Sequence, residues 1–288
     1  RPPRSTLFPY TTLFRSMKRN IIIRIIAFLS LVFMITLNAL ANILPINGLN
    51  TGEISDSFFN LFAPAPITFV IWALIYALLF MYSIVQLKVD HDLSVRQNLF
   101  DDIAIPFTLS NIANGLWIIA WHFLRIDISL ILIVFVLICL IVIMIEINRT
   151  SLYNNDGFFI ALPFSIYFGW ITVATIANVT TLLVSLGYST SLNQPLLGIG
   201  DDVWLLVMLV VGALVMTLST LKFRARAYGL VFVWAYFGIY LKITDLPQNS
   251  DLLIFTYLPQ IILGLIGYFF IVLIIVSLRI KKDKYKLG

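Results

Sequence analysis

Eight long apolar segments occupy most of the 288-residue chain, and they restrict its fold more than any other feature. The hydrocarbon core of a bilayer is about 30 Å thick, and a helix of about 20 apolar residues crosses it. Backbone N–H and C=O groups inside hydrocarbon must bond one another, which a helix achieves within a single segment. The sequence therefore predicts an all-α membrane protein with eight spans. They cover residues 21–44, 66–87, 103–124, 128–147, 158–183, 203–221, 227–241 and 252–278, and the seventh is the shortest.

Residues 1–16 are expected to be foreign to the protein. The stretch TLFPYTTLFRS, from Thr6 to Ser16, reads as the translation of a sequencing adapter, so Met17 is expected to be the natural start. The segment holds three of the nineteen basic residues and none of the fourteen acidic ones, so the net charge of +5 falls to +2 over residues 17–288. A charge this small gives no indication of nucleic-acid binding.

Lysine and arginine residues divide unequally between the loops that connect the spans. Loops on the cytoplasmic side of a membrane are enriched in these residues. From residue 17 on, one set of alternate loops and the two ends hold fourteen of them, whereas the other loops hold only Arg125 and Lys242. One span more or fewer would destroy this alternation. The pattern predicts a multi-pass protein of the plasma membrane with both termini cytoplasmic and with the run Lys281 to Lys286 against anionic lipid.

Three of the spans carry tryptophan together with tyrosine or asparagine at helical spacing. Residues 60–76 read NLFAPAPITFVIWALIY, where a segment with two prolines leads into a span with a Trp-x-x-x-Tyr pair. The third span contains NGLW, and the fifth contains YFGW followed by an alanine and an asparagine. The residues in these motifs are Trp72, Tyr76, Asn114, Trp117, Tyr167, Trp170, Ala174 and Asn178.

In these motifs and their order, the chain resembles the TspO/MBR family of tryptophan-rich sensory or translocator proteins. The resemblance covers about residues 24 to 185 and implies a five-helix transmembrane bundle. We therefore expect a five-helix domain over residues 17–186 and an extension with about three further spans over residues 187–288, as in an extended bacterial form. No Leu-x-Tyr-x-x-x-Arg pattern of the cholesterol-binding type follows the fifth span, which argues against a steroid ligand.

The motif residues lie on one face of each of the three helices, because they are three or four positions apart. At 1.5 Å per residue, Trp72 and Trp117 lie about 10 Å inside the spans and Trp170 lies near the middle. Interfacial tryptophans lie nearer the ends of spans. The side chains could simply pack the helices together. Alternatively, they line a shared hollow whose indole faces suit a planar ring and whose amides suit its polar edge.

The resemblance favours the hollow and implies a tetrapyrrole, a porphyrin or haem, as its ligand. Trp72 and Trp170 would then contact the ring, and Asn114 would orient a polar group. Residues 45–65 form the longest loop on the side with few basic residues, and we expect this loop to cover the hollow, as it does in the family. No resident cofactor and no metal are expected.

Several other residues have structural interpretations. His122 is expected at the membrane interface, and Gly169 is expected to allow the close approach of another helix. The pairs Asp101–Asp102 and Asp201–Asp202 are expected to lie at helix N-termini, where carboxylates complement the helix dipole. The single cysteine, Cys139, excludes an internal disulfide.

The leading hypothesis is a membrane-embedded sensory or ligand-binding protein without enzymatic activity. No hydrolase, P-loop or zinc-peptidase motif occurs, and no ionisable residue lies at the centre of a span, which argues against an ion-coupled pump. The alternative is a permease that lets the ligand cross the membrane. A third hypothesis, also implied by the family, is light- or oxygen-dependent porphyrin breakdown. The expected partners are the lipid bilayer, a planar apolar small molecule and a second copy in a homodimer.

Overall fold

The computed structural model describes residues 8–44, 46–58, 60–88, 94–150, 152, 156–187, 200–246 and 253–286. Every regular element in these ranges is a helix, and eight helices are long and apolar enough to cross a bilayer. This confirms the all-α membrane class and the predicted number of spans. Residues 1–7 of the segment expected to be foreign lie outside the described ranges. The spans are Asn20–Ile43, Pro66–Val85, Arg96–His122, Ile126–Arg149, Gly157–Ser185, Asp202–Phe223, Arg226–Asp245 and Tyr257–Ile280.

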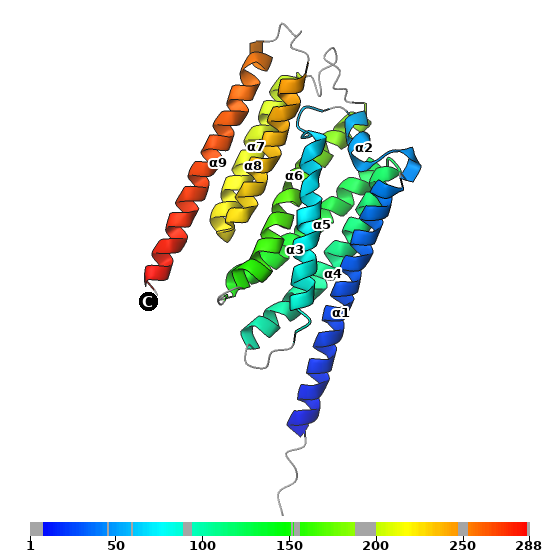
Figure 1. The fold of residues 1–288 in the computed structure, drawn as a ribbon, viewed down its shortest axis with the longest axis vertical. Coiled ribbons are helices and arrows are strands. Elements are labelled where there is room, and N and C mark those ends of the chain that lie inside the picture. The colour runs from blue at the N-terminus through cyan, green and yellow to red at the C-terminus, as the bar shows by residue number, and fades with distance from the viewer. Residues whose placement is uncertain are drawn as a thin grey trace, which may run out of the picture.

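Five long helices form one bundle (Figure 1). Helix α4 packs against α1 on one side and α5 on the other, whereas α6 packs against α5 and α3. Short turns η2 and η3 lead into α3 and α6. The elements are α1 (Phe8–Ile43), η2 (Pro66–Val70), α3 (Ile71–Val85), α4 (Ser94–His122), α5 (Ile126–Arg149), η3 (Gly157–Ala161) and α6 (Leu162–Ser185).

Three further helices lie beyond α6, on the side away from α1 (Figure 1). They are α7 (Asp201–Phe223), α8 (Arg226–Asp245) and α9 (Leu253–Lys286), and α8 makes the main contact with α6. Gly169 of α6 permits this contact, since a Cβ there would lie 2.9 Å from Val231 Cβ of α8. The close helix contact predicted at Gly169 is therefore made with α8 of the same chain.

The two ends of the bundle differ in what connects the helices. At one end, η1 (Ile46–Gly48) and α2 (Thr51–Ser57) lie between α1 and α3, and we call this the α2 end (Figure 1). The loops after α3, α5 and α7 lie at the other end, which we call the basic end because it holds Lys88, Arg149 and Lys222. Helix α7 begins at Asp201, as predicted for an acidic helix start.

The predicted start of the third span is wrong by several residues. Helix α4 begins at Ser94, so Asp101 and Asp102 lie two turns inside the helix and do not cap its N-terminus. The first two turns of α4 are polar because they lie at the basic end, where hydropathy alone gives no signal for a helix. Asp101 is tolerated inside the helix because Arg24 of α1 pairs with it.

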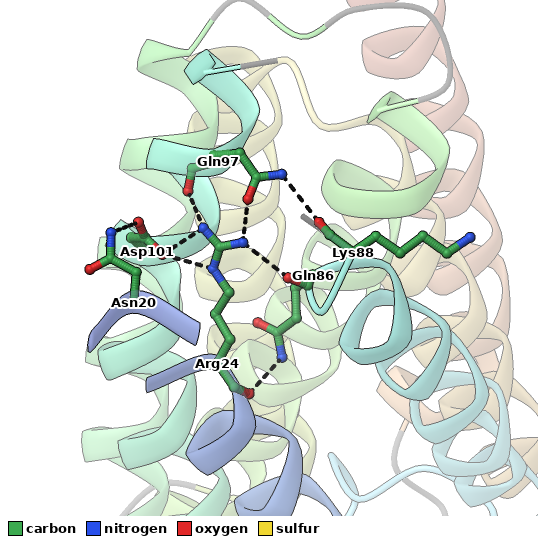
Figure 2. Close-up of polar contacts among 6 residues, drawn as sticks. All are labelled: Asn20, Arg24, Gln86, Lys88, Gln97 and Asp101. Atoms are coloured by element: carbon green, nitrogen blue, oxygen red, sulfur yellow. Dashed lines mark hydrogen bonds and ion pairs between the residues drawn. The ribbon is translucent and has the colours of Figure 1, made fainter. Parts of the chain in front are cut away.

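Arg24 is the centre of a buried polar network at the basic end, which Figure 2 shows. Its side chain is 3% exposed and lies 2.7 Å from a carboxylate oxygen of Asp101, to which Asn20 also donates a hydrogen bond of 2.6 Å. The same guanidinium donates to the side chain and the carbonyl of Gln97 and to the carbonyl of Gln86. One arginine therefore joins α1, α4 and the C-terminal end of α3.

Large aromatic side chains fill the bundle between this network and the tryptophans. Tyr82 of α3 packs edge-on against Phe107 of α4 and Phe164 of α6, with ring centroids 5.4 and 4.7 Å away. All three side chains are fully buried. Edge-to-face pairs contribute about 0.5–1.5 kcal/mol beyond their burial. This packing closes the space between α3, α4 and α6 on the basic side of the bundle.

We expect Arg24→Met to destabilise the bundle by about 3 kcal/mol, because loss of one member leaves a largely buried carboxylate without its cation. The measurement is the free energy of unfolding in mixed detergent micelles. Arg149→Met is the matched control, since Arg149 pairs with Glu146 at the same end but is 70% exposed, and such pairs contribute only about 0–1 kcal/mol. Equal losses in the two variants would contradict the role assigned to Arg24.

Candidate ligand-binding site

The described residues between α1 and α3, 46–58 and 60–70, form what we call the cover, at the α2 end. Asn50 caps helix α2, and its side chain accepts hydrogen bonds of 3.0 Å from the backbone N–H groups of Gly52 and Glu53. The Glu53 carboxylate in turn accepts a 2.7 Å bond from the Asn50 backbone. This reciprocal capping stabilises a helix of only two turns. Thr51 and Ser55, on the inner face of α2, are buried.

His122 ties this cover to the end of α4. The sequence predicted a position at the membrane interface for His122, and the structure shows that its side chain is fully buried under the cover. Its Nδ1 donates to the carbonyl of Ile46 at 3.2 Å, and its Nε2 lies 3.2 Å from the Thr51 hydroxyl. The indole N–H of Trp121 donates to the Thr51 carbonyl at 3.3 Å. Hydrogen bonds at Ile46 and Thr51, in the first half of the cover, therefore attach it to the end of α4.

Helix α8 holds the second half of the cover. The Lys242 ammonium donates to the carbonyl of Asn60 at 3.2 Å, and the Trp234 indole N–H donates to the carbonyl of Thr68 at 3.0 Å. The backbone N–H of Ala65 donates to the Gly238 carbonyl at 3.0 Å. Gly238 is needed here, because a Cβ would lie 2.1 Å from the Thr68 methyl carbon. The C-terminal helices therefore help to position the cover.

Under the cover, Trp72 lies at the centre of an aromatic cluster. It stacks on Tyr76 of the same helix, with ring centroids 5.5 Å apart and planes at 26°. Trp117 of α4 lies 6.2 Å away, and Tyr167 and Trp170 of α6 each lie 6.3 Å away with their rings at steep angles. The three spans that carry the sequence motifs thus bring these aromatic residues together.

Two cavities adjoin this cluster. One, of about 40 Å³, lies between α2, α3, α4 and α6, and the other, of about 250 Å³, lies between α1, α2, α3 and α4. Thr51, Phe69, Trp72 and Trp117 line both cavities. The smaller cavity is also lined by Trp121, Trp170, Ala174, Asn178 and Thr181, and the larger by Asn38, Asn42, Asn50 and Tyr76.

Two indole N–H groups in these walls lack a hydrogen-bond partner among the described residues. They belong to Trp117 and Trp170, whose side chains are 5% and 2% exposed. A buried donor without an acceptor costs about 1–3 kcal/mol. The side chains of both tryptophans line the smaller cavity.

The eight predicted site residues divide into two groups. Six of them line a cavity: Trp72, Tyr76, Trp117, Trp170, Ala174 and Asn178. The other two, Asn114 and Tyr167, line neither cavity and form a hydrogen-bonded layer behind the cluster. The Asn114 amide accepts from Asn38 at 3.0 Å and donates to the Tyr167 hydroxyl at 3.1 Å. Its polar groups are thus engaged within the protein.

Sequence reasoning missed the polar wall that α1 contributes. Asn38 and Asn42 lie four residues apart in an apolar span and line the larger cavity. The same helical spacing that singled out the other motifs applies to this pair, so the signal was present. Thr51 and Ser55 of the cover had no such signal, because their position depends on how the loop folds back.

We expect Gly238→Ala to loosen the cover, because the added methyl group displaces Thr68 and Pro64 from α8 and overpacking of this kind costs about 1–3 kcal/mol. The measurements are the unfolding temperature and the rate of maleimide labelling at Ser55→Cys, in a Cys139→Ala background. Gly267→Ala on α9 is the control, since a Cβ there meets nothing within 4 Å while the gain in helix propensity is the same. Labelling at the same rate in both would contradict the role of α8.

Comparison with known families identifies one match. The model of the family described as TSPO-like protein matches residues 24–278. The match includes α7, α8 and most of α9, beyond the five-helix unit from which the resemblance was first inferred. No curated protein and no solved structure matches the chain.

Proposed function

The chain belongs to the TspO/MBR family, and we propose that it is a membrane-embedded receptor for a planar apolar molecule of the tetrapyrrole class. The observation that carries this proposal is the pair of partnerless indole donors, Trp117 and Trp170, beside a wall of aromatic rings. The rings offer flat faces for stacking, and the donors offer bonds to a carboxylate or carbonyl at the edge of the ligand.

The size of the cavities sets a condition on binding. Sites for small molecules usually enclose about 300–1,000 Å³, whereas the larger cavity encloses about 250 Å³. The rings of Phe69, Trp72 and Trp117 line both cavities. A tetrapyrrole would therefore require these rings to turn, or the cover to lift, so that the two spaces join. Binding would proceed with a change of conformation rather than into a preformed site.

The aromatic packing near the basic end favours a protein that binds its ligand over one that lets the ligand cross the membrane. Tyr82, Phe107 and Phe164 fill the bundle between the cavities and the basic end. A permease would have to open this packing and the Arg24 network as well. A role in binding is also favoured over catalysis, because the residues that line the two cavities include no carboxylate, imidazole or thiol.

We expect protoporphyrin IX to quench tryptophan fluorescence of the detergent-solubilised protein saturably. Trp170→Phe should weaken the affinity about fivefold, since one hydrogen bond contributes about 1 kcal/mol. The unfolding temperature of the ligand-free variant should not fall, because the lost donor had no partner. Trp72→Phe should also weaken binding through the smaller stacking surface.

The matched control is Trp204→Phe on α7, which removes another buried indole N–H without a partner, away from both cavities. It should leave the affinity unchanged. Quenching without saturation, or the same affinity in every variant, would contradict the proposed site. Flux of the porphyrin through proteoliposomes at a rate proportional to the protein would favour the permease.

We further propose that the basic end faces the cytoplasm of a cell whose plasma membrane holds the protein, since basic loops are retained on that side. Asn98, at the basic end, and Asp127, at the α2 end, are both exposed. In intact cells, a membrane-impermeant maleimide should label Asp127→Cys and not Asn98→Cys. Both variants should react after the cells are lysed. The reverse pattern in intact cells would overturn the orientation.

A further inference from the structure

An apolar groove runs between α3 and α8 on the lipid-facing side of α6. It encloses about 600 Å³, and the residues that line it carry only hydrocarbon side chains except for Trp234. Ile71 and Val231 form its buried floor, with 7% and 3% exposure. Val70 and Leu230 form rims that are more than half exposed. The groove therefore opens sideways, toward the hydrocarbon of the bilayer.

The groove is closed at the α2 end. There α8 meets η2, and the Trp234 indole N–H donates to the carbonyl of Thr68. This bond also satisfies the only polar side-chain group in the lining, so the wall presents carbon alone to an occupant. Such a surface fits a hydrocarbon chain and offers nothing to the polar edge of a tetrapyrrole.

The other end of the groove adjoins a basic turn between α7 and α8. Leu162 and Ala227 line the groove there, and Ala227 directly follows Arg226. Residues 222–226 hold three basic residues and no acidic one, and all three basic side chains are exposed. Arg226 has no ion-pair partner among the described residues. Basic pockets between transmembrane helices at the cytoplasmic side are typical sites for anionic lipid headgroups.

We propose that this groove binds one anionic phospholipid of the bilayer, with an acyl chain between α3 and α8 and its phosphate at Arg226. Ala227 and Trp234 are seven residues apart on α8, which corresponds to about 10 Å along the axis. One leaflet contributes about half of the 30 Å hydrocarbon core, so the upper part of an acyl chain fits this length. The lipid would fill the gap between α3 and α8, which the two helices leave below their contact at η2. This inference does not depend on the ligand proposed for the cavities.

The test uses the full chain, delipidated in detergent, with dioleoyl phosphatidylglycerol and dioleoyl phosphatidylcholine as probes. Native mass spectrometry counts retained lipids, and thermal unfolding measures stabilisation. We expect one tightly retained phosphatidylglycerol and a higher unfolding temperature with it than with phosphatidylcholine. Equal retention and equal stabilisation by the two lipids would overturn the headgroup site at Arg226.

Two pairs of variants separate the chain site from the headgroup site. Leu230→Trp fills the groove and should abolish retention, whereas Leu214→Trp, on an exposed face of α7 outside the groove, should not. Arg226→Gln should weaken retention of phosphatidylglycerol about fivefold, as expected for one basic residue near a lipid phosphate. Arg279→Gln, which is exposed on α9 at the same end, should leave it unchanged.

Identical behaviour within either pair would overturn the corresponding part of the proposal. Ala73→Phe, from the α3 wall, provides a second way to fill the groove if Leu230→Trp does not fold. Retention of lipid in both filled variants would place the lipid elsewhere on the protein and refute the site.

Discussion

A polar group inside hydrocarbon has no water to bond, and the rest of this structure depends on how each such group finds a partner. Arg24 finds its partners on α3 and α4. Asn38 and Asn114 find theirs in each other and in Tyr167. These two layers fix how α1, α3, α4 and α6 pack, because an amide or guanidinium left without a partner would cost far more than an apolar mismatch. Among the buried polar groups that lack a partner within the described residues, the indoles of Trp117 and Trp170 are those whose side chains line the smaller cavity.

Much of the fold could be predicted because hydropathy and helical spacing are local properties of a sequence. The spans follow from apolar length, and the faces of Trp72, Trp117 and Trp170 follow from positions along single helices. What could not be predicted depends on contacts between distant segments. Asp101 stands inside a helix because Arg24 reaches it from another span, and His122 is buried because the cover folds over it. The sequence around each of these two residues gives no indication of its partner.

The candidate site shows the same division. A single hollow could be inferred from three tryptophan-bearing faces, but the structure has two cavities there, which share Trp72 and Trp117 in their linings. The role of the C-terminal helices could not be inferred either, because Gly238 and Lys242 look like ordinary residues of an apolar helix until the loop before α3 lies against them. The family match through residue 278 agrees with a structure in which these helices and the five-helix unit form one packed body.

The hydrogen bonds between α8 and the cover affect which residues of the cover can be substituted. The hydrogen bonds between α8 and the cover go to main-chain atoms, which are the carbonyls of Asn60 and Thr68 and the N–H of Ala65. Main-chain atoms are the same whatever side chains the loop carries. A residue of the cover that lines a cavity, such as Ala63, can therefore be exchanged without loss of these bonds to α8. Ligand preference and the hydrogen bonds from α8 to the loop therefore depend on different atoms, so that one can change while the other is retained.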